Sequence, residues 1–242
     1  MIFGKYIAHR GLHGGNIPEN SLTAFKAAAD NGLAIELDVR LTKDCKLVVF
    51  HDKDLMRMCG VEGNVRDYTY NQLGAFTLKG SDEKIPLLTD VLKCVGGRVP
   101  LLIEIKNGEP LISTEKRLNA LLKKYVGDYA VQSFDPLSML WFRIFAPNVT
   151  RGQLISQNKK NFDLEYILRL ICANPLVWRL ISKPDFISAD LRSASQSQKQ
   201  QAQEIGADYI IWTVRTKQQL KAANYFTDTV IFEDIAILEE VR

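Results

Sequence analysis

The feature that most constrains the fold is a regular alternation of strand-like apolar runs with helical segments. In the second half of the chain, strand-like runs lie at 101–106, 129–134, 150–155, 186–191, 209–214 and 229–233. Helical patterns follow them at 113–125, 136–145, 162–182, 194–205, 216–224 and 234–241. Runs at 5–9 and 34–39 bring the number of predicted strands to eight. Strand–helix alternation predicts a parallel sheet, and eight units predict a (β/α)8 TIM barrel.

An open doubly wound sheet is the structural alternative. It is not favoured as a dinucleotide-binding fold, because no GxGxxG motif follows the first strand. The length of 242 residues suits a barrel of roughly 250 residues, so we expect residues 1–242 to form a single catalytic barrel domain.

The run Leu47–His51 is strand-like but begins too soon to be the next parallel strand. Only Arg40–Lys46 separates it from the strand at 34–39, whereas a parallel crossover needs about a dozen residues. We therefore predict an antiparallel excursion that returns His51 to the same end as Asp38. Residues 53–84 have weak periodicity and are predicted to be a small irregular insertion after the second strand, with a cap over the site as one interpretation.

Composition and charge exclude several classes of protein. The net charge of +3 is spread along the chain and gives no reason to expect a nucleic-acid partner, although it suits anionic substrates. There is no basic-then-apolar leader and no apolar run of membrane-spanning length. The four cysteines lack metal-binding spacing and are expected to be reduced. We expect a cytoplasmic monomer or homodimer with no stable membrane insertion, and with peripheral membrane contact as an open alternative.

Charged residues gather at the carboxyl ends of the predicted strands, where barrel enzymes place their chemistry. Glu36 and Asp38 lie two apart on one face of a strand, and Glu104 and Lys106 repeat that spacing. The set at this rim is His9, Arg10, Glu36, Asp38, His51, Glu104 and Lys106, joined by the aromatic residues Phe134 and Trp212. A purely structural alternative exists for each one: Lys106 pairs with Glu104 on a solvated strand end, and both aromatic residues belong to the barrel core.

Taken together, these residue types indicate phosphoryl transfer. Three carboxylates without a His or Cys ligand favour a hard divalent cation, Mg²⁺ or Ca²⁺. Arg10 and Lys106 supply positive charge for a phosphate group. His9 and His51 can act as an acid–base pair because the ordinary imidazole pKa is close to neutrality.

At these residues the sequence resembles the glycerophosphodiester phosphodiesterase family. The ordered set of matching stretches is AHRG at 8–11, PENS at 18–21, ELD at 36–38, VVFHD at 48–52, EIK at 104–106, QSF at 132–134 and WTV at 212–214. The resemblance implies metal-dependent hydrolysis of a small-molecule glycerophosphodiester to an alcohol and sn-glycerol 3-phosphate, on a (β/α)8 barrel. It implies attack by the substrate's own glycerol hydroxyl, followed by opening of a cyclic phosphate by water.

The resemblance also implies residue roles. Glu36, Asp38 and Glu104 are expected to hold the metal. His9 and His51 are expected to be the acid–base pair, with His9 preferred as the base, while Arg10 and Lys106 grip the phosphate.

Three departures from the family pattern stand out. Cys45 occupies a turn position where Gly is usual, which costs little unless that position needs φ > 0. Arg215 follows WTV where Asn is common, and the last strand reads VIFED where Thr-Asp followed by Pro is usual. We expect Phe134, Trp212 and Arg215 to line the substrate pocket, and Arg215 to favour an anionic leaving group.

Two other functions stay open at this level. One is a different metal-dependent barrel enzyme acting on a phosphorylated substrate. The other is a non-catalytic, membrane-associated barrel, for which the apolar segment 162–182 with its flanking cations is the supporting feature. An outer helix packed on the barrel is the simpler interpretation of that segment.

Overall fold

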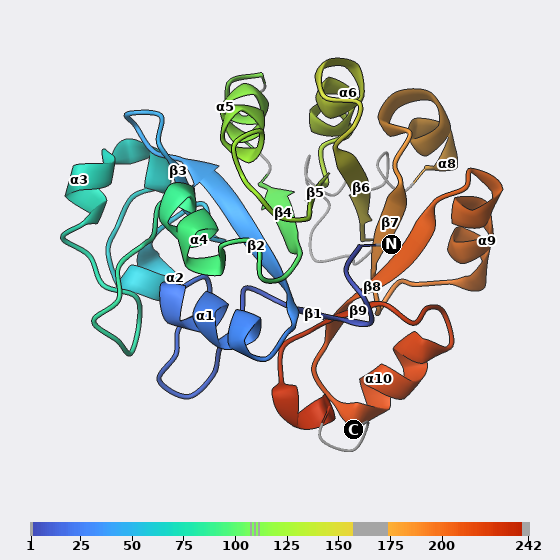
Figure 1. The fold of residues 1–242 in the computed structure, drawn as a ribbon, viewed down its shortest axis with the longest axis horizontal. Coiled ribbons are helices and arrows are strands. Elements are labelled where there is room, and N and C mark those ends of the chain that lie inside the picture. The colour runs from blue at the N-terminus through green and yellow to red at the C-terminus, as the bar shows by residue number, and fades with distance from the viewer. Residues whose placement is uncertain (1, 107, 109, 111, 157–173, 239–242) are drawn as a thin grey trace. The chain divides into compact units, whose positions relative to one another are not determined.

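The computed structural model describes residues 2–106, 108, 110, 112–156 and 174–238 (Figure 1). In chain order its elements are β1 (Tyr6–Ala8), α1 (Leu22–Asp30), β2 (Ala34–Leu41), β3 (Leu47–Val49), α2 (Met56–Cys59), η1 (Val65–Asp67), α3 (Tyr70–Leu73), α4 (Leu88–Val95), β4 (Leu101–Ile105), α5 (Ser113–Leu122), β5 (Tyr129–Ser133), α6 (Pro136–Phe145), β6 (Thr150–Ile155), α8 (Pro175–Val177), η2 (Trp178–Ser182), β7 (Phe186–Asp190), α9 (Gln196–Glu204), β8 (Asp208–Val214), α10 (Lys217–Asn224), β9 (Val230–Phe232) and η3 (Ile235–Leu238). With β3 set aside, the order is the (β/α)8 TIM barrel predicted from the sequence.

The contacts divide the chain into two compact units. One comprises Ala8–Asp128, and the other comprises Met1–Ile7 with Tyr129–Arg242. Every residue proposed above for metal binding, acid–base chemistry or phosphate binding belongs to the Ala8–Asp128 unit. Phe134, Trp212 and Arg215 belong to the other unit.

Strand β2 is the centre of the Ala8–Asp128 unit. It pairs with β4 in parallel, and Asp38 lies opposite Glu104 in that register. It pairs with β3 in antiparallel fashion, and Leu41 lies opposite Leu47. All eight residues of β2 are buried, so its two acidic side chains are held in a largely apolar interior. The predicted excursion and its direction are confirmed.

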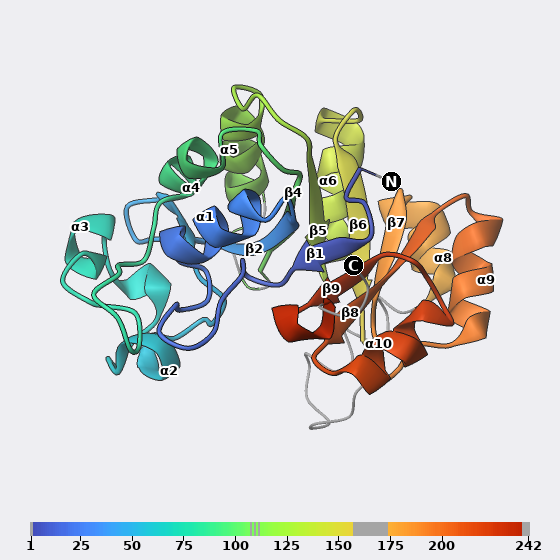
Figure 2. The same ribbon diagram turned by 60° about the horizontal axis from the view of Figure 1, so that its bottom comes forward.

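Helix α1 closes the first loop of this unit. The Ser21 hydroxyl accepts a hydrogen bond from the Ala24 N–H and so caps the helix. Gly11 has φ +79°, and a Cβ there would lie 2.8 Å from the Ala24 backbone. Glycine is therefore required by the close approach of the His9–Gly11 turn to α1. Helices α1 and α4 lie side by side (Figure 2).

The segment 53–84 contains α2, η1 and α3, so it has more regular structure than its weak periodicity suggested. Its apolar residues form a cluster of their own with the end of β3. The buried members are Val48, Phe50, Leu55, Met58, Val65, Leu73, Leu78 and Ile85. Sequence periodicity missed these elements because each is only a turn or so long, too short for a 3.6-residue repeat to show.

In the other unit, β5 to β9 run in parallel, each beside the next. Helix α6 packs against η2, and α9 and α10 pack against β8 (Figure 1). Pro175, which falls within the predicted helix 162–182, begins α8, with Asn174 as its cap. Residues 162–173 of the predicted helix at 162–182 lie outside the described residues. The predicted last helix, 234–241, is a 3₁₀ turn at Ile235–Leu238, and its remainder lies outside the described residues.

Candidate active site

Three buried carboxylates from two neighbouring strands come together in the Ala8–Asp128 unit. Glu36 and Asp38 extend from β2, and Glu104 extends from β4 beside Asp38. One oxygen from each lies within 4.8 Å of the others. Glu36 and Asp38 are each 1% exposed and Glu104 is 8% exposed. The predicted spacing on one strand face and the parallel register together produce this cluster.

The carboxylates are in unequal electrostatic environments. Burial, reinforced by the charges of Asp38 and Glu104, raises the pKa of Glu36 well above its ordinary value. Burial alone would also raise the pKa of Asp38, but the cationic groups around it, led by Lys106, hold that pKa well below its ordinary value. The cluster therefore contains one acid that favours its ionised form and one that resists ionisation.

Two cations predicted to grip phosphate lie against these acids. The Lys106 Nζ atom is 2.5 Å from Glu104 Oε1 and 3.2 Å from Asp38 Oδ1. The Arg10 Nε atom is 3.4 Å from Asp38 Oδ2, and its Nη1 atom donates to Glu19 at 2.7 Å. Lys106 does pair with Glu104, as the structural alternative expected, but both side chains are only about a tenth exposed, so the pair is not on a solvated strand end.

Asn20 fixes the orientation of Asp38. Its Nδ2 atom donates to Asp38 Oδ2 at 2.8 Å, and the buried Asn20 has a left-handed φ of 56°. The Arg10 backbone N–H similarly donates to Glu36 Oε2 at 3.0 Å. In the sequence, Asn20 was quoted only as part of the PENS stretch at 18–21. The start of helix α1 could have revealed this role of Asn20. The helix needs one capping residue, which is Ser21, so the neighbouring Asn20 side chain is left for another partner.

The two histidines have different neighbours. The His9 Nε2 atom lies 3.9 Å from Glu36 Oε2. The His51 Nδ1 atom lies 2.6 Å from Asp52 Oδ1, a contact in which Nδ1–H donates and Nε2 is left as the other ring nitrogen. An acid–base group is commonly oriented by such a carboxylate. Asp52 was quoted in the sequence motif but received no role there.

A chain of ion pairs extends from His51 into the insertion. Arg57 of α2 donates its Nε to Asp52 at 2.5 Å and both Nη atoms to Glu19, at 2.9 and 2.6 Å. Glu19 in turn accepts from Arg10. Burial would raise the pKa of Asp52, but hydrogen bonds from His51 and Arg57 hold it below its ordinary value. Sequence reasoning missed Glu19 and Arg57, because their positions 38 residues apart show no local pattern.

The donor set fits a hard divalent cation. It consists of three carboxylates, which suit Mg²⁺ or Ca²⁺ better than a softer metal. In the described part of the protein, Asp38 Oδ1 is buried and accepts no hydrogen bond, although the Lys106 ammonium lies 3.2 Å away, so a cation could bind this oxygen in place of part of that ion pair. The cluster can therefore hold a metal ion.

The remaining predicted site residues are in the other unit. The Phe134 and Trp212 rings meet edge to face with centroids 5.9 Å apart, and Trp212 Nε1 donates to the Ser188 carbonyl at 3.0 Å. The Arg215 guanidinium forms a two-point ion pair with Glu233. Arg215 is thus charge-compensated within its own unit.

No helix in the described ranges combines the length and apolar composition needed to cross a lipid bilayer.

Comparison with known proteins gives a family match over nearly the whole chain. The model of the glycerophosphoryl diester phosphodiesterase family matches residues 9–238. A glycerophosphodiester phosphodiesterase from Caldanaerobacter subterraneus subsp. tengcongensis is 38% identical over 159 residues, which is 61% of this chain and 65% of that protein. The chain spans about two thirds or less of the length of the curated relatives it matches.

Solved structures of similar proteins share the fold. A glycerophosphodiester phosphodiesterase from Parabacteroides distasonis superposes with a TM-score of 0.76 at 20% identity, with 98% of each chain covered. A phosphodiesterase from Oleispira antarctica, solved in complex with the product sn-glycerol-3-phosphate, gives a TM-score of 0.74 at 22% identity, covering 95% of this chain and 93% of that one. At these identities the likeness confirms the predicted fold class.

Proposed function

Because the chain belongs to the glycerophosphoryl diester phosphodiesterase family, we propose that it hydrolyses glycerophosphodiesters to an alcohol and sn-glycerol 3-phosphate. The observation that carries the proposal is the buried cluster of Glu36, Asp38 and Glu104, with His9 lying 3.9 Å from Glu36 and Lys106 lying 2.5 Å from Glu104. The product named in the Oleispira antarctica complex supports the same substrate class.

Glu36, Asp38 and Glu104 would hold a divalent cation, Mg²⁺ or Ca²⁺. When bound, the cation supplies positive charge that offsets charge on phosphate oxygens and lowers the pKa of an attached hydroxyl. Asn20 keeps Asp38 oriented by its 2.8 Å hydrogen bond, as outer-shell partners of metal ligands commonly do.

Arg10 and Lys106 are proposed to bind the phosphate. Both side chains are close to carboxylates in the structure, so each would exchange part of that pairing for phosphate oxygens. The exchange keeps their charge compensated throughout, which matters because Arg10 and Lys106 are largely buried.

His9 is proposed as the base in the first step. It takes the proton from the glycerol 2-hydroxyl, whose oxygen forms a new bond to phosphorus. The bond from phosphorus to the leaving alcohol breaks, and His51 gives that alcohol oxygen a proton. The contact from Asp52 to His51 Nδ1 supports the acid role, because it stabilises the protonated ring and leaves Nε2–H for the leaving oxygen.

The second step reverses these roles. The deprotonated His51 takes a proton from water, the water oxygen bonds to the phosphorus of the cyclic phosphate, and the bond to the glycerol 2-oxygen breaks. The protonated His9 returns its proton to that oxygen. The sum is one diester and one water consumed, with one alcohol and one glycerol 3-phosphate formed.

Turnover of several glycerophosphodiesters, assayed after EDTA treatment and again after adding back Mg²⁺ or Ca²⁺, tests the proposal. We expect release of glycerol 3-phosphate that stops with EDTA and returns with one of the cations. Failure to hydrolyse any glycerophosphodiester with either cation would reject the activity, and full turnover in EDTA would reject the metal role.

A further inference from the structure

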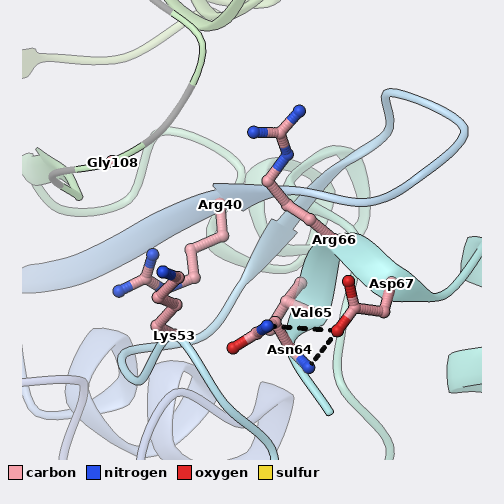
Figure 3. Close-up of a pocket in the computed structure, with 7 residues that line it drawn as sticks. All are labelled: Arg40, Lys53, Asn64, Val65, Arg66, Asp67 and Gly108. Carbon is pink, nitrogen blue, oxygen red and sulfur yellow. Dashed lines mark hydrogen bonds between the residues drawn. The ribbon is translucent and has the colours of Figure 1, made fainter.

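A pocket in the Ala8–Asp128 unit has a lining that includes none of the three clustered carboxylates. Its volume is about 350 Å³. The lining combines the end of β2, the loop after His51, the turn η1 and the loop after β4, and consists of Arg40, Lys53, Asn64, Val65, Arg66, Asp67 and Gly108 (Figure 3). In Figure 3 the ends of the Arg40 and Lys53 side chains overlap in this view, while the Arg66 side chain extends from η1 in another direction.

The pocket carries an excess of positive charge. Arg40, Lys53 and Arg66 are cationic, and Asp67 is the one acidic residue among the lining residues. Asp67 is already engaged, because its Oδ2 accepts from the Asn64 N–H at 2.7 Å and from Asn64 Nδ2 at 3.1 Å. Among the described residues, the side chains of Lys53 and Arg66 form no ion pair or hydrogen bond. An anion entering the pocket would therefore meet uncompensated cations.

Backbone contacts build this arrangement. The Val65 N–H donates to the Lys53 carbonyl at 3.0 Å, and Asp54 and Asn64 form an antiparallel bridge. These contacts hold the chain around Lys53 against η1, which brings Arg66 to the same pocket. The cations thus belong to a folded part of the insertion with a buried apolar cluster beneath it.

The pocket adjoins the proposed general acid. Arg40 donates its Nε and Nη2 atoms to the His51 carbonyl at 3.0 and 2.9 Å. Lys53 follows His51 by two residues, a distance of at most about 7 Å along the chain. His51 is the residue proposed to protonate the leaving alcohol, so Arg40 and Lys53 are close in the chain or in contact with the residue that would meet that alcohol.

We propose that this pocket binds an anionic group carried by the leaving alcohol, so that the enzyme prefers diesters whose alcohol bears a carboxylate or a second phosphate. The inference rests on the proposed function and refines its substrate class. Arg215, the residue that the sequence suggested for this role, is paired with Glu233, whereas Lys53 and Arg66 have no acidic partner among the described residues.

Glycerophosphoserine and glycerophosphoethanolamine form a matched pair of substrates, because they differ by one carboxylate. The ratio of their kcat/KM values is measured for the wild type and for Lys53→Gln, Arg66→Gln and the double variant. Lys79→Gln is the control, since it removes an exposed cation of the same insertion that does not line the pocket. Arg40 is left intact because it holds the His51 backbone.

The wild type is expected to prefer the serine diester. The double variant should lower that preference roughly three- to tenfold, mainly through KM, as expected for two partly exposed charge contacts. The preference should also fall as salt is added, and Lys79→Gln should retain it. A wild type without the preference, or a double variant that keeps it, overturns the inference. A wild type that hydrolyses neither diester rejects the proposed activity itself, before any variant is compared.

A carboxylate and a second phosphate are distinguished by a third substrate, the diester of glycerol 3-phosphate with a phosphorylated alcohol. If the double variant loses its preference over glycerophosphoethanolamine for this substrate alone, the pocket is assigned to phosphate. If the preference for the serine diester is lost as well, the pocket is assigned to anions in general.

Discussion

Asp38 and Glu104 are cross-strand partners in the parallel register of β2 and β4, and one lysine nitrogen lies 3.2 Å from the first carboxylate and 2.5 Å from the second. That lysine is Lys106, two residues beyond Glu104 and directly after the end of β4. The register thus converts two short sequence patterns into one buried cluster. Lys106 and Arg10 already pair with Asp38 and Glu104, so a divalent cation bound by the three carboxylates would share them with these two side chains.

Binding of a divalent cation should stabilise the protein. With free Mg²⁺ or Ca²⁺ at a hundred times its dissociation constant, the free energy of unfolding should rise by about 2.7 kcal/mol. The measurement is urea denaturation of EDTA-treated protein with and without the cation. Glu36→Gln should lose most of the increase, while Glu62→Gln, an exposed acid in the insertion, should keep it. An undiminished increase in Glu36→Gln would contradict the assignment of the cluster.

The two histidines should differ in their dependence on the leaving group. His9→Ala should lower kcat on all diesters by roughly 10²–10⁴-fold, because a base is needed whatever alcohol leaves. His51→Ala should have a similar effect on glycerophosphocholine but a much smaller one on a nitrophenyl diester, whose leaving group needs no proton. Steady-state kinetics of both variants on both substrates provide the test, with circular dichroism to establish that each is folded. The reverse pattern would exchange the roles of the two residues.

Asn20 should matter for the cation as well as for the fold. Removing its hydrogen bond to the buried Asp38 should destabilise the protein by about 1–3 kcal/mol and weaken cation affinity by roughly 10–100-fold. Asn20→Gly is the suitable variant, since glycine tolerates the φ of 56° at this position. Calorimetric titration with Mg²⁺ or Ca²⁺ reports the affinity. Unchanged affinity would limit Asn20 to a structural role.

Cys45 has a φ of 58°, in the left-handed region that favours glycine. A residue with a Cβ is therefore expected to lower the stability of the protein at this position. Cys45→Gly should therefore stabilise the protein, by about 0.5–1 kcal/mol once the greater freedom of glycine in the unfolded chain is subtracted. Cys45→Ala keeps the Cβ and should leave stability nearly unchanged, which makes it the matched control. Chemical denaturation of the three proteins under reducing conditions measures the difference. Equal stability of the Gly and Ala variants would show that the turn tolerates the side chain.

The ion pair between Arg57 and Asp52 should make stability depend on acid pH. The pKa of Asp52 is lower in the folded protein than in the unfolded chain, so its contribution is present above the unfolded value near pH 4 and is lost as the pH falls further. Arg57→Gln removes one cause of the low pKa and should lose less stability between pH 5 and pH 3 than the wild type does. Urea midpoints across that range test this. Parallel curves for the two proteins would contradict it.

Much of the fold follows from local sequence patterns. Helix α6 and strand β6 have the predicted bounds, and β3 is antiparallel because the linker of Arg40–Lys46 is too short for a crossover. The short elements of 53–84 were not predictable, since they are stabilised by a shared apolar cluster and not by their own periodicity. The predicted single domain, the assignment of the site residues to their roles and the lid function of 53–84 stay predictions.

By itself, the sequence determined which carboxylates share a strand face, because a strand repeats every two residues and Glu36 and Asp38 obey that period. It likewise determined the direction of Leu47–Val49. Only the tertiary structure decided that Asp38 lies opposite Glu104, that Arg57 reaches both Glu19 and Asp52, and that Lys53 and Arg66 share a pocket. These relationships join residues distant along the chain, and backbone register and packing, which no local period encodes, bring them together.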